Sequence, residues 1–166
     1  MAMAKIITES GMDFIADNTF FIEKATLYLN LGSGVRSVEF VRLMGDKLLF
    51  IEARTTFPNP NNPSVENYAK FKSEIEEICE KFIHSLNLYS SVKTGVAEDA
   101  LPDNFVSPDK VFLSFILVVK NHELKWCKPI REKLKMSLPV YVKKIWKPEV
   151  FVINQDTAVE RNLVMS

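Results

Sequence analysis

The segment Val111–Val119, with the sequence VFLSFILVV, constrains the fold more than any other stretch of the chain. It carries no charged residue and no polar face, and β-branched or aromatic residues make up most of it. A strand covered on one face alternates apolar and polar residues, whereas a strand buried on both faces does not. The segment therefore predicts a central strand of a sheet that is covered on both sides.

Two helices are predicted around this strand. The Asn- and Pro-rich segment 57–63 stops any preceding element, and Ser64 after it suits a helix N-cap. Apolar residues then recur at three- and four-residue steps as far as Tyr89, which predicts one long amphipathic helix. A second helix is predicted with Pro129 in its first turn, and Pro139 breaks or kinks it.

The remaining elements complete a mixed α/β pattern. Residues 10–30 are ambiguous, since they fit a helix over residues 13–25 but also a strand in TLYLNL. Residues 94–110 are expected to form a loop, and a short helix capped by Asp156 or Thr157 is expected at the end. Further strands are predicted at 35–43, 47–55 and 150–154. The sequence thus predicts a single α/β domain over residues 1–166, with a mixed central β-sheet flanked by helices.

The segment VEFVRLMGDKLLFIEAR (residues 38–54) predicts a β-hairpin around Gly45-Asp46. With a two- or four-residue loop, Leu43 lies opposite Leu48, and the same register places Glu39 opposite Glu52. Alternation puts these pairs on one face of the sheet, which ends in two facing carboxylates and then Arg54. Like charges in this position repel each other, by roughly 0.2–1 kcal/mol when they are exposed.

Three things could relieve that repulsion: a shared proton, a nearby cation such as Arg54, or a divalent metal. Mg²⁺ would suit the position because it binds carboxylate oxygens and keeps other ligand positions for water or phosphate. The alternative is that Glu39 and Glu52 lie at a solvated strand end, or pair with neighbouring basic residues. A three-residue loop would shift the register and remove the argument for a site.

The hairpin resembles the central motif of the PD-(D/E)xK nucleases, which share the restriction endonuclease-like fold. In that superfamily one strand carries an acid and the next carries acid-x-lysine, matched here by Glu39 in VEF and by Glu52-Ala53-Arg54 in FIEART. The resemblance implies a core of the order αβββαβ with C-terminal additions. It also implies a metal site of Glu39 and Glu52, with Glu23 as the additional acid that many members carry on the first helix.

Two departures from the family pattern bear on activity. Glu39 stands where the family usually has Asp, and Arg54 stands where it has the lysine that helps to activate the attacking water. Arginine keeps the charge and binds phosphate, but it is a poor proton relay. Because some members take the lysine from a neighbouring element, Lys70 or Lys72 on the long helix are candidates to replace it.

If the protein is active, the resemblance implies hydrolysis of DNA phosphodiester bonds with Mg²⁺ or Mn²⁺ as cofactor. Glu39, Glu52 and Arg54 would be its catalytic residues, and the enzyme would be an endonuclease or an exonuclease. The alternative is a non-catalytic member of the fold that binds nucleic acid or protein and has a degenerate site, with Arg54 in place of the lysine.

Charge is unevenly distributed along a chain whose formal net charge is zero. Between Lys120 and Lys147 there are nine basic and two acidic residues, a net charge of 9 − 2 = +7. Such a segment can bind phosphate groups of DNA or RNA, or it can be a solvated helix face. Trp126, Tyr141 and Trp146 are interleaved with the lysines and could stack on bases, although core positions are the commoner use of such aromatics. The residues expected to contact nucleic acid are Lys70, Lys125, Lys128, Arg131 and Lys135.

Other classes of function are disfavoured by the sequence. Cys79 and Cys127 lie far apart without a CxxC motif, which argues against a disulfide framework or a zinc site and favours a reducing compartment. No P-loop or nucleophile-elbow motif is present. The chain has neither the apolar core of a signal peptide nor a segment of about 20 apolar residues. A cytoplasmic protein with no membrane partner is therefore expected, while its oligomeric state stays open.

Overall fold

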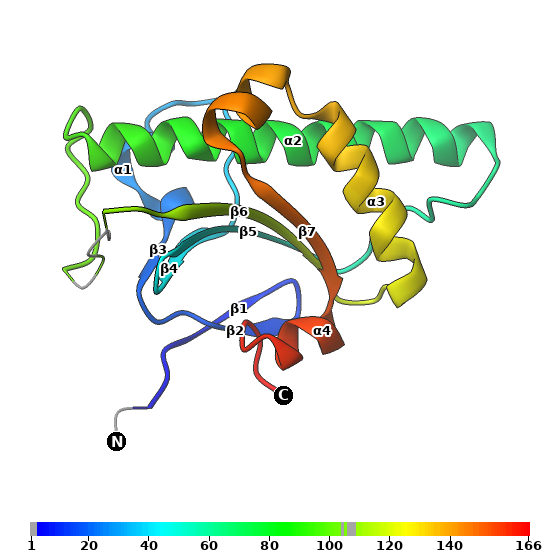
Figure 1. The fold of residues 1–166 in the computed structure, drawn as a ribbon, viewed down its shortest axis with the longest axis horizontal. Coiled ribbons are helices and arrows are strands. Elements are labelled where there is room, and N and C mark those ends of the chain that lie inside the picture. Colours follow the sequence, from blue (N-terminus) through cyan, green and yellow to red (C-terminus); the bar gives the residue numbers. More distant parts are fainter. Residues whose placement is uncertain (1–2, 104, 106–108) are drawn as a thin grey trace.

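The computed structural model describes residues 3–103, 105 and 109–166, and it contains a mixed five-stranded sheet of order β3-β4-β5-β6-β7 (Figure 1). Part of the loop predicted at 94–110, residues 104 and 106–108, lies outside the described residues. The strands of this sheet are β3 (Thr19–Phe20), β4 (Phe40–Met44), β5 (Lys47–Arg54), β6 (Phe112–Val119) and β7 (Glu149–Asn154). The predicted class, a mixed sheet flanked by helices, is therefore confirmed.

The strand pairing follows the pattern that the sequence predicts for the hairpin. β4 and β5 are antiparallel, with Leu43 opposite Leu48 and Val41 opposite Phe50. Gly45 has φ +60°, which suits the first central position of a two-residue type II′ turn. β5, β6 and β7 are parallel to one another, and the sheet aligns Arg54 with Val119 and Val119 with Asn154. The carboxyl ends of these three strands therefore lie at the same end of the sheet, where β4 begins.

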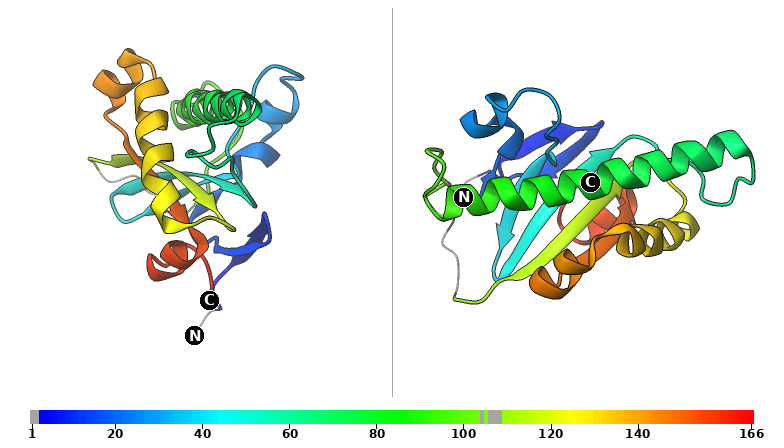
Figure 2. Two further views of the ribbon diagram at one scale, coloured as in Figure 1. Left: turned by 90° about the vertical axis from the view of Figure 1, so that its right-hand side faces the viewer. Right: turned by 90° about the horizontal axis from the view of Figure 1, so that it is seen from above.

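Both faces of the sheet are covered, as the apolar β6 segment requires (Figures 1 and 2). On one face, α2 (Val65–Lys93) and α3 (Leu124–Ser137) pack on a core that includes Phe50, Phe82 and Phe115. The rings of Phe82 and Phe115 are stacked, with centroids 4.7 Å apart. The other face is covered by the hairpin of β1 (Ile6–Glu9) and β2 (Met12–Ile15) and by α4 (Gln155–Glu160).

The helix considered for residues 13–25 is wrong. Residues 10 and 11 form a two-residue turn between β1 and β2, in which Ser10 (φ +49°) and Gly11 (φ +73°) both adopt the positive φ of a type I′ hairpin. The chain then forms β3, the short 3-10 helix η1 (Ile22–Lys24) and the one-turn helix α1 (Thr26–Leu29). TLYLNL therefore holds a helix where a strand was the other option.

The predicted helix start is confirmed for α2 but is wrong for α3 and α4. Ser64 is the N-cap of α2, and its side chain accepts a hydrogen bond from the Asn67 N–H, as predicted. Pro129, however, lies inside α3 and not in its first turn, because the helix already begins at Leu124. α4 is capped by Asn154, whose side chain accepts from the Thr157 N–H, and not by either residue predicted. Between α3 and β7 runs a π-helical segment, η2 (Val142–Trp146).

Candidate functional site

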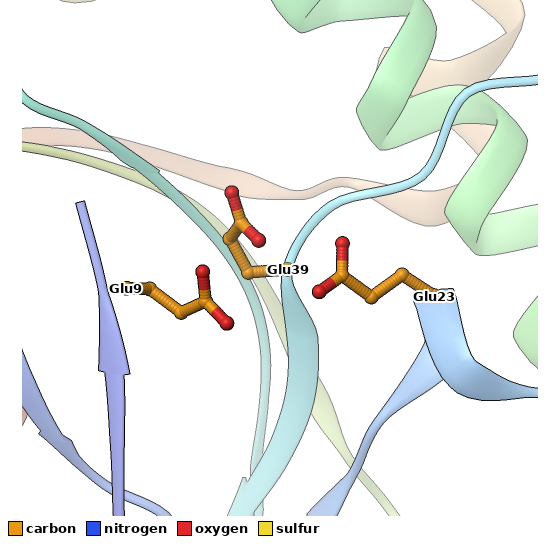
Figure 3. A group of neighbouring side chains, drawn as sticks. All are labelled: Glu9, Glu23 and Glu39. Carbon is orange, nitrogen blue, oxygen red and sulfur yellow. The ribbon is translucent and has the colours of Figure 1, made fainter.

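Three carboxylates converge at the end of the sheet where β4 begins (Figure 3). Glu9 is the last residue of β1, Glu23 lies in η1, and Glu39 directly precedes β4. One carboxylate oxygen from each lies within 4.8 Å of the other two, and all three side chains are partly buried. We call these residues the acidic cluster.

Hydrogen bonds from distant parts of the chain hold the cluster together. The Ser10 hydroxyl donates to the Ala53 carbonyl at 3.1 Å, which ties the β1–β2 turn, and with it Glu9, to the end of β5. The segment before β4 is fixed to α2, because the Val38 N–H donates to the buried Ser85 hydroxyl at 2.8 Å. The Glu39 N–H then donates at 3.1 Å to the carbonyl of Ile51, the residue that already pairs with Phe40. The regular register therefore ends at Phe40, and the predicted pairing of Glu39 with Glu52 does not continue it.

Glu52 lies on β5 beside the acidic cluster and is fully buried. Its Oε1 accepts hydrogen bonds from Lys81 Nζ at 2.7 Å and from Arg54 Nε at 3.2 Å. Its Oε2 is also buried but has no hydrogen-bond partner among the described residues. One oxygen of this carboxylate is therefore fully compensated, while the other is left without the partner that a buried polar atom normally has.

Arg54 pairs with three carboxylates that are not part of the acidic cluster. Besides its bond to Glu52, it pairs with Glu74 Oε2 at 3.2 Å and with Glu77 Oε1 at 2.8 Å, both on α2. Arg54 thus ties the end of β5 to the helix. All three of its guanidinium nitrogens are engaged in these ion pairs.

Burial and mutual repulsion disfavour negative charge throughout the site. The pKa of Glu39 is raised to about 8, first by burial and then by the charges of Glu52, Glu23 and Glu9. The pKa of Glu23 is also raised, mainly by burial and by Glu9. Burial raises the pKa of Glu52 as well, although Lys81 and Arg54 oppose that shift. Two things can relieve such raised carboxyl pKa values: a proton shared between carboxyls, as in the side-chain hydrogen bond between Glu23 and Glu39, or an additional cation.

The structure brings two of the three predicted metal ligands, Glu23 and Glu39, into direct proximity. Glu52 is outside that group of three, but its charge acts on Glu39. Sequence reasoning missed Glu9, which reaches the site only through the β1–β2 turn. It also missed Lys81, since Lys70 and Lys72 were the lysines of α2 considered for this position.

A signal for the inward orientation of Lys81 was present in the sequence. Glu74, Glu77 and Lys81 follow one another at steps of three and four, so they share one side of the helix. The structure shows that this side faces Arg54 and Glu52. Lys70 and Lys72, the lysines considered as replacements for Arg54, make no hydrogen bond with Glu52 among the described residues.

The predicted nucleic-acid contacts are spread over two helices. Lys70 lies on α2 and lines a cavity of about 380 Å³ that also includes Arg54, Ser10 and Thr55. The other four lie on α3, where Lys125 pairs with Glu123 and Arg131 with Glu132 on the surface. α3 follows β6, which ends at the same end of the sheet as β5, so the start of α3 and not its end lies toward the end of the sheet that carries the site. Contact of these lysines and Arg131 with nucleic acid stays a prediction.

The donors at this site suit a hard divalent cation. All are carboxylate oxygens, the ligands that Mg²⁺ and Mn²⁺ prefer. Glu52, whose Oε2 is buried without a partner among the described residues, adds its charge to the site from outside this group of three. Within the described residues, no helix has the combination of length and apolar character that crossing a membrane requires. Comparison of the chain with protein-family models, with curated proteins and with solved structures found no match.

Proposed function

We propose that the chain is a metal-dependent nuclease-like hydrolase that cleaves phosphodiester bonds of DNA, built on a restriction endonuclease-like core. The order of elements supports this proposal. The antiparallel strands β3, β4 and β5 are followed by α2 and then by the parallel strand β6, as in the core that the resemblance implies. The first helix of that core is represented only by η1 and α1, which lie between β3 and β4.

The observation that carries the proposal is the acidic cluster at the start of β4, together with the buried Glu52 on β5, whose charge acts on Glu39. Glu9, Glu23 and Glu39 converge within 4.8 Å, and Glu52 has a buried oxygen without a hydrogen-bond partner among the described residues. No protein cation within the described residues compensates the three cluster carboxylates by a direct ion pair. A divalent cation held there would activate water as a nucleophile and neutralise charge that develops on the phosphate.

Lys81 supplies the cation that the motif lacks. Its Nζ lies 2.7 Å from Glu52, and its positive charge also acts on Glu39 and Glu23. Arg54, in contrast, is tied to Glu74 and Glu77. We therefore assign Lys81 the role of holding Glu52 and stabilising phosphate charge, and Arg54 the role of orienting Glu52 and α2. We further propose that Lys70, which lines a cavity together with Arg54, contacts a neighbouring phosphate.

The alternative function is binding of nucleic acid or protein without catalysis. It is favoured by the same Arg54 contacts, because a guanidinium engaged by three carboxylates cannot also hold a scissile phosphate. In this case Glu52 and its two cations would form a structural ion-pair network that has replaced an active site.

Cleavage assays in Mn²⁺ and Mg²⁺ with single- and double-stranded DNA and RNA separate the two functions. The proposal expects metal-dependent cleavage that Glu52→Gln and Lys81→Met reduce by at least about a hundredfold. The matched control is Glu76→Gln, which changes an exposed carboxylate on α2 and should leave the rate unchanged. Absence of cleavage from a folded protein, or cleavage that is indifferent to Glu52→Gln, would reject the catalytic proposal.

A further inference from the structure

The segment from the end of α3 through η2 exposes an unusual combination of apolar and basic side chains. Between Lys133 and Lys147 the chain has five lysines and no acidic residue. Apart from the buried anchors Leu138 and Val142, the apolar side chains of this segment that follow Lys135 are largely exposed. The exposed fractions are 72% for Met136, 59% for Val140, 57% for Tyr141, 71% for Ile145 and 45% for Trp146. We call Lys135–Lys147 the basic corner.

The backbone of the basic corner is also unusual. η2 is π-helical, a rare geometry that occurs mostly in short pieces at functional positions, and Lys147 ends it in the left-handed region at φ +48°. Five consecutive residues, 143–147, are exposed. The exposed apolar residues Tyr141, Ile145 and Trp146 therefore lie in the same short segment as the exposed lysines Lys143, Lys144 and Lys147.

The basic corner lies at the opposite end of the strands from the acidic cluster. η2 leads into β7, which runs from Glu149 beside Ser114 to Asn154 beside Val119. β7 therefore ends, and does not begin, at the end of the sheet that carries the site. Figure 2 shows η2 beside α3 on the helix-covered side of the sheet, away from the β1–β2 hairpin that carries Glu9. The basic corner is therefore a second surface and not a wall of the proposed active site.

Three kinds of occupant differ in how well they match these side chains. A second copy docked symmetrically would bring lysines against lysines. A nucleic acid would pair with the lysines and stack on Tyr141 or Trp146, but it would leave the aliphatic Met136, Val140 and Ile145 in water. An anionic lipid surface accepts both kinds of group, since lysines pair with headgroups, Trp and Tyr lie at the interface, and aliphatic side chains enter the acyl region.

We propose that the basic corner binds anionic lipid membranes at their surface. None of Lys135, Lys143, Lys144 and Lys147 forms an ion pair with a described residue, so their charges are available to lipid phosphates. This differs from the expectation of no membrane partner, which rested on the lack of a long apolar segment. Binding in the plane of the interface requires no spanning helix.

The two tryptophans allow a direct test. In a Trp126→Phe variant, Trp146 is the only tryptophan and reports on the basic corner. The protein should co-sediment with vesicles of phosphatidylcholine that contain about one-third phosphatidylglycerol, and its tryptophan fluorescence should shift to shorter wavelength. Vesicles of pure phosphatidylcholine should produce neither effect. Salt should weaken the binding. No co-sedimentation with anionic vesicles, or equal binding to neutral ones, would overturn the proposal.

Substitutions localise the effect. Ile145→Asp, and Lys143→Glu combined with Lys144→Glu, should each weaken vesicle binding by roughly tenfold or more. The matched controls Val65→Asp, and Lys72→Glu combined with Lys93→Glu, change exposed residues of α2 and should leave binding unchanged. Vesicle binding that survives Ile145→Asp would place the contact elsewhere. Loss of oligonucleotide binding in the lysine variant, without any vesicle binding by the unmodified protein, would show a nucleic-acid surface instead.

Discussion

The substitution Lys81→Met tests the ion-pair arrangement around Glu52. Lys81 Nζ lies 2.7 Å from Glu52 Oε1, and the two side chains are only 19% and 1% exposed. Removing one partner of a buried pair costs about 3–5 kcal/mol when the remaining charge is left alone. Arg54 stays 3.2 Å from the same oxygen, so the expected loss of unfolding free energy is smaller, about 2 kcal/mol. For a chain of this size that corresponds to a fall in Tm of roughly 4–8 °C.

A double-mutant cycle with Glu52→Gln separates the charge interaction from the loss of packing. Once Glu52 is neutral, Lys81→Met removes no charge pair, so it should cost at least about 1 kcal/mol less in that background. Urea denaturation at fixed pH measures all four free energies. Equal costs in both backgrounds would refute the ion-pair account, and so would a loss below about 0.5 kcal/mol in the unmodified protein.

Three further outcomes are expected. The pKa of Glu39 is raised to about 8 in the folded state, so the native protein binds more protons than the unfolded protein between about pH 4.5 and pH 8. The stability that Glu39 contributes therefore falls as pH rises through that window, and thermal unfolding of Glu39→Gln should depend less on pH there. An unchanged pH profile would contradict the burial argument. Phe82→Ala removes a fully buried ring stacked on Phe115 and should cost about 3–5 kcal/mol in urea denaturation, with a cost below about 1 kcal/mol inconsistent with this core. Ser64→Ala removes the cap hydrogen bond to Asn67 and should cost about 1 kcal/mol, whereas Ser64→Asp should largely restore stability.

The central sheet could be predicted from the sequence because its signals are local. Period-two alternation and the Gly45-Asp46 turn specify which residues of β4 and β5 face each other, and the uninterrupted apolar run of β6 requires cover on both faces. The long helix α2 is specified equally well by its apolar stripe and its cap at Ser64.

The rest of the candidate site depends on tertiary contacts that no local pattern specifies. The turn at Ser10 needs a positive φ at a non-glycine residue, and the apolar content of the following residues suits a helix as well as strands. Glu9 therefore enters the site through a hairpin that the periodicity conceals. A polar face of a helix is usually solvated, but this face of α2 finds charged partners in Glu52 and Arg54 on the sheet. Lys81 faces inward for that reason.

A Mn²⁺ titration tests the central claim, that the carboxylates at the start of β4 hold a divalent cation. Calorimetry should show Mn²⁺ binding that strengthens as pH rises toward about 8, because Glu39 must lose its proton to act as a ligand. Glu39→Gln should weaken the binding by at least about tenfold, while Glu76→Gln on the exposed face of α2 should leave it unchanged. Mn²⁺ affinity that is the same in the unmodified protein and in Glu39→Gln would contradict the claim.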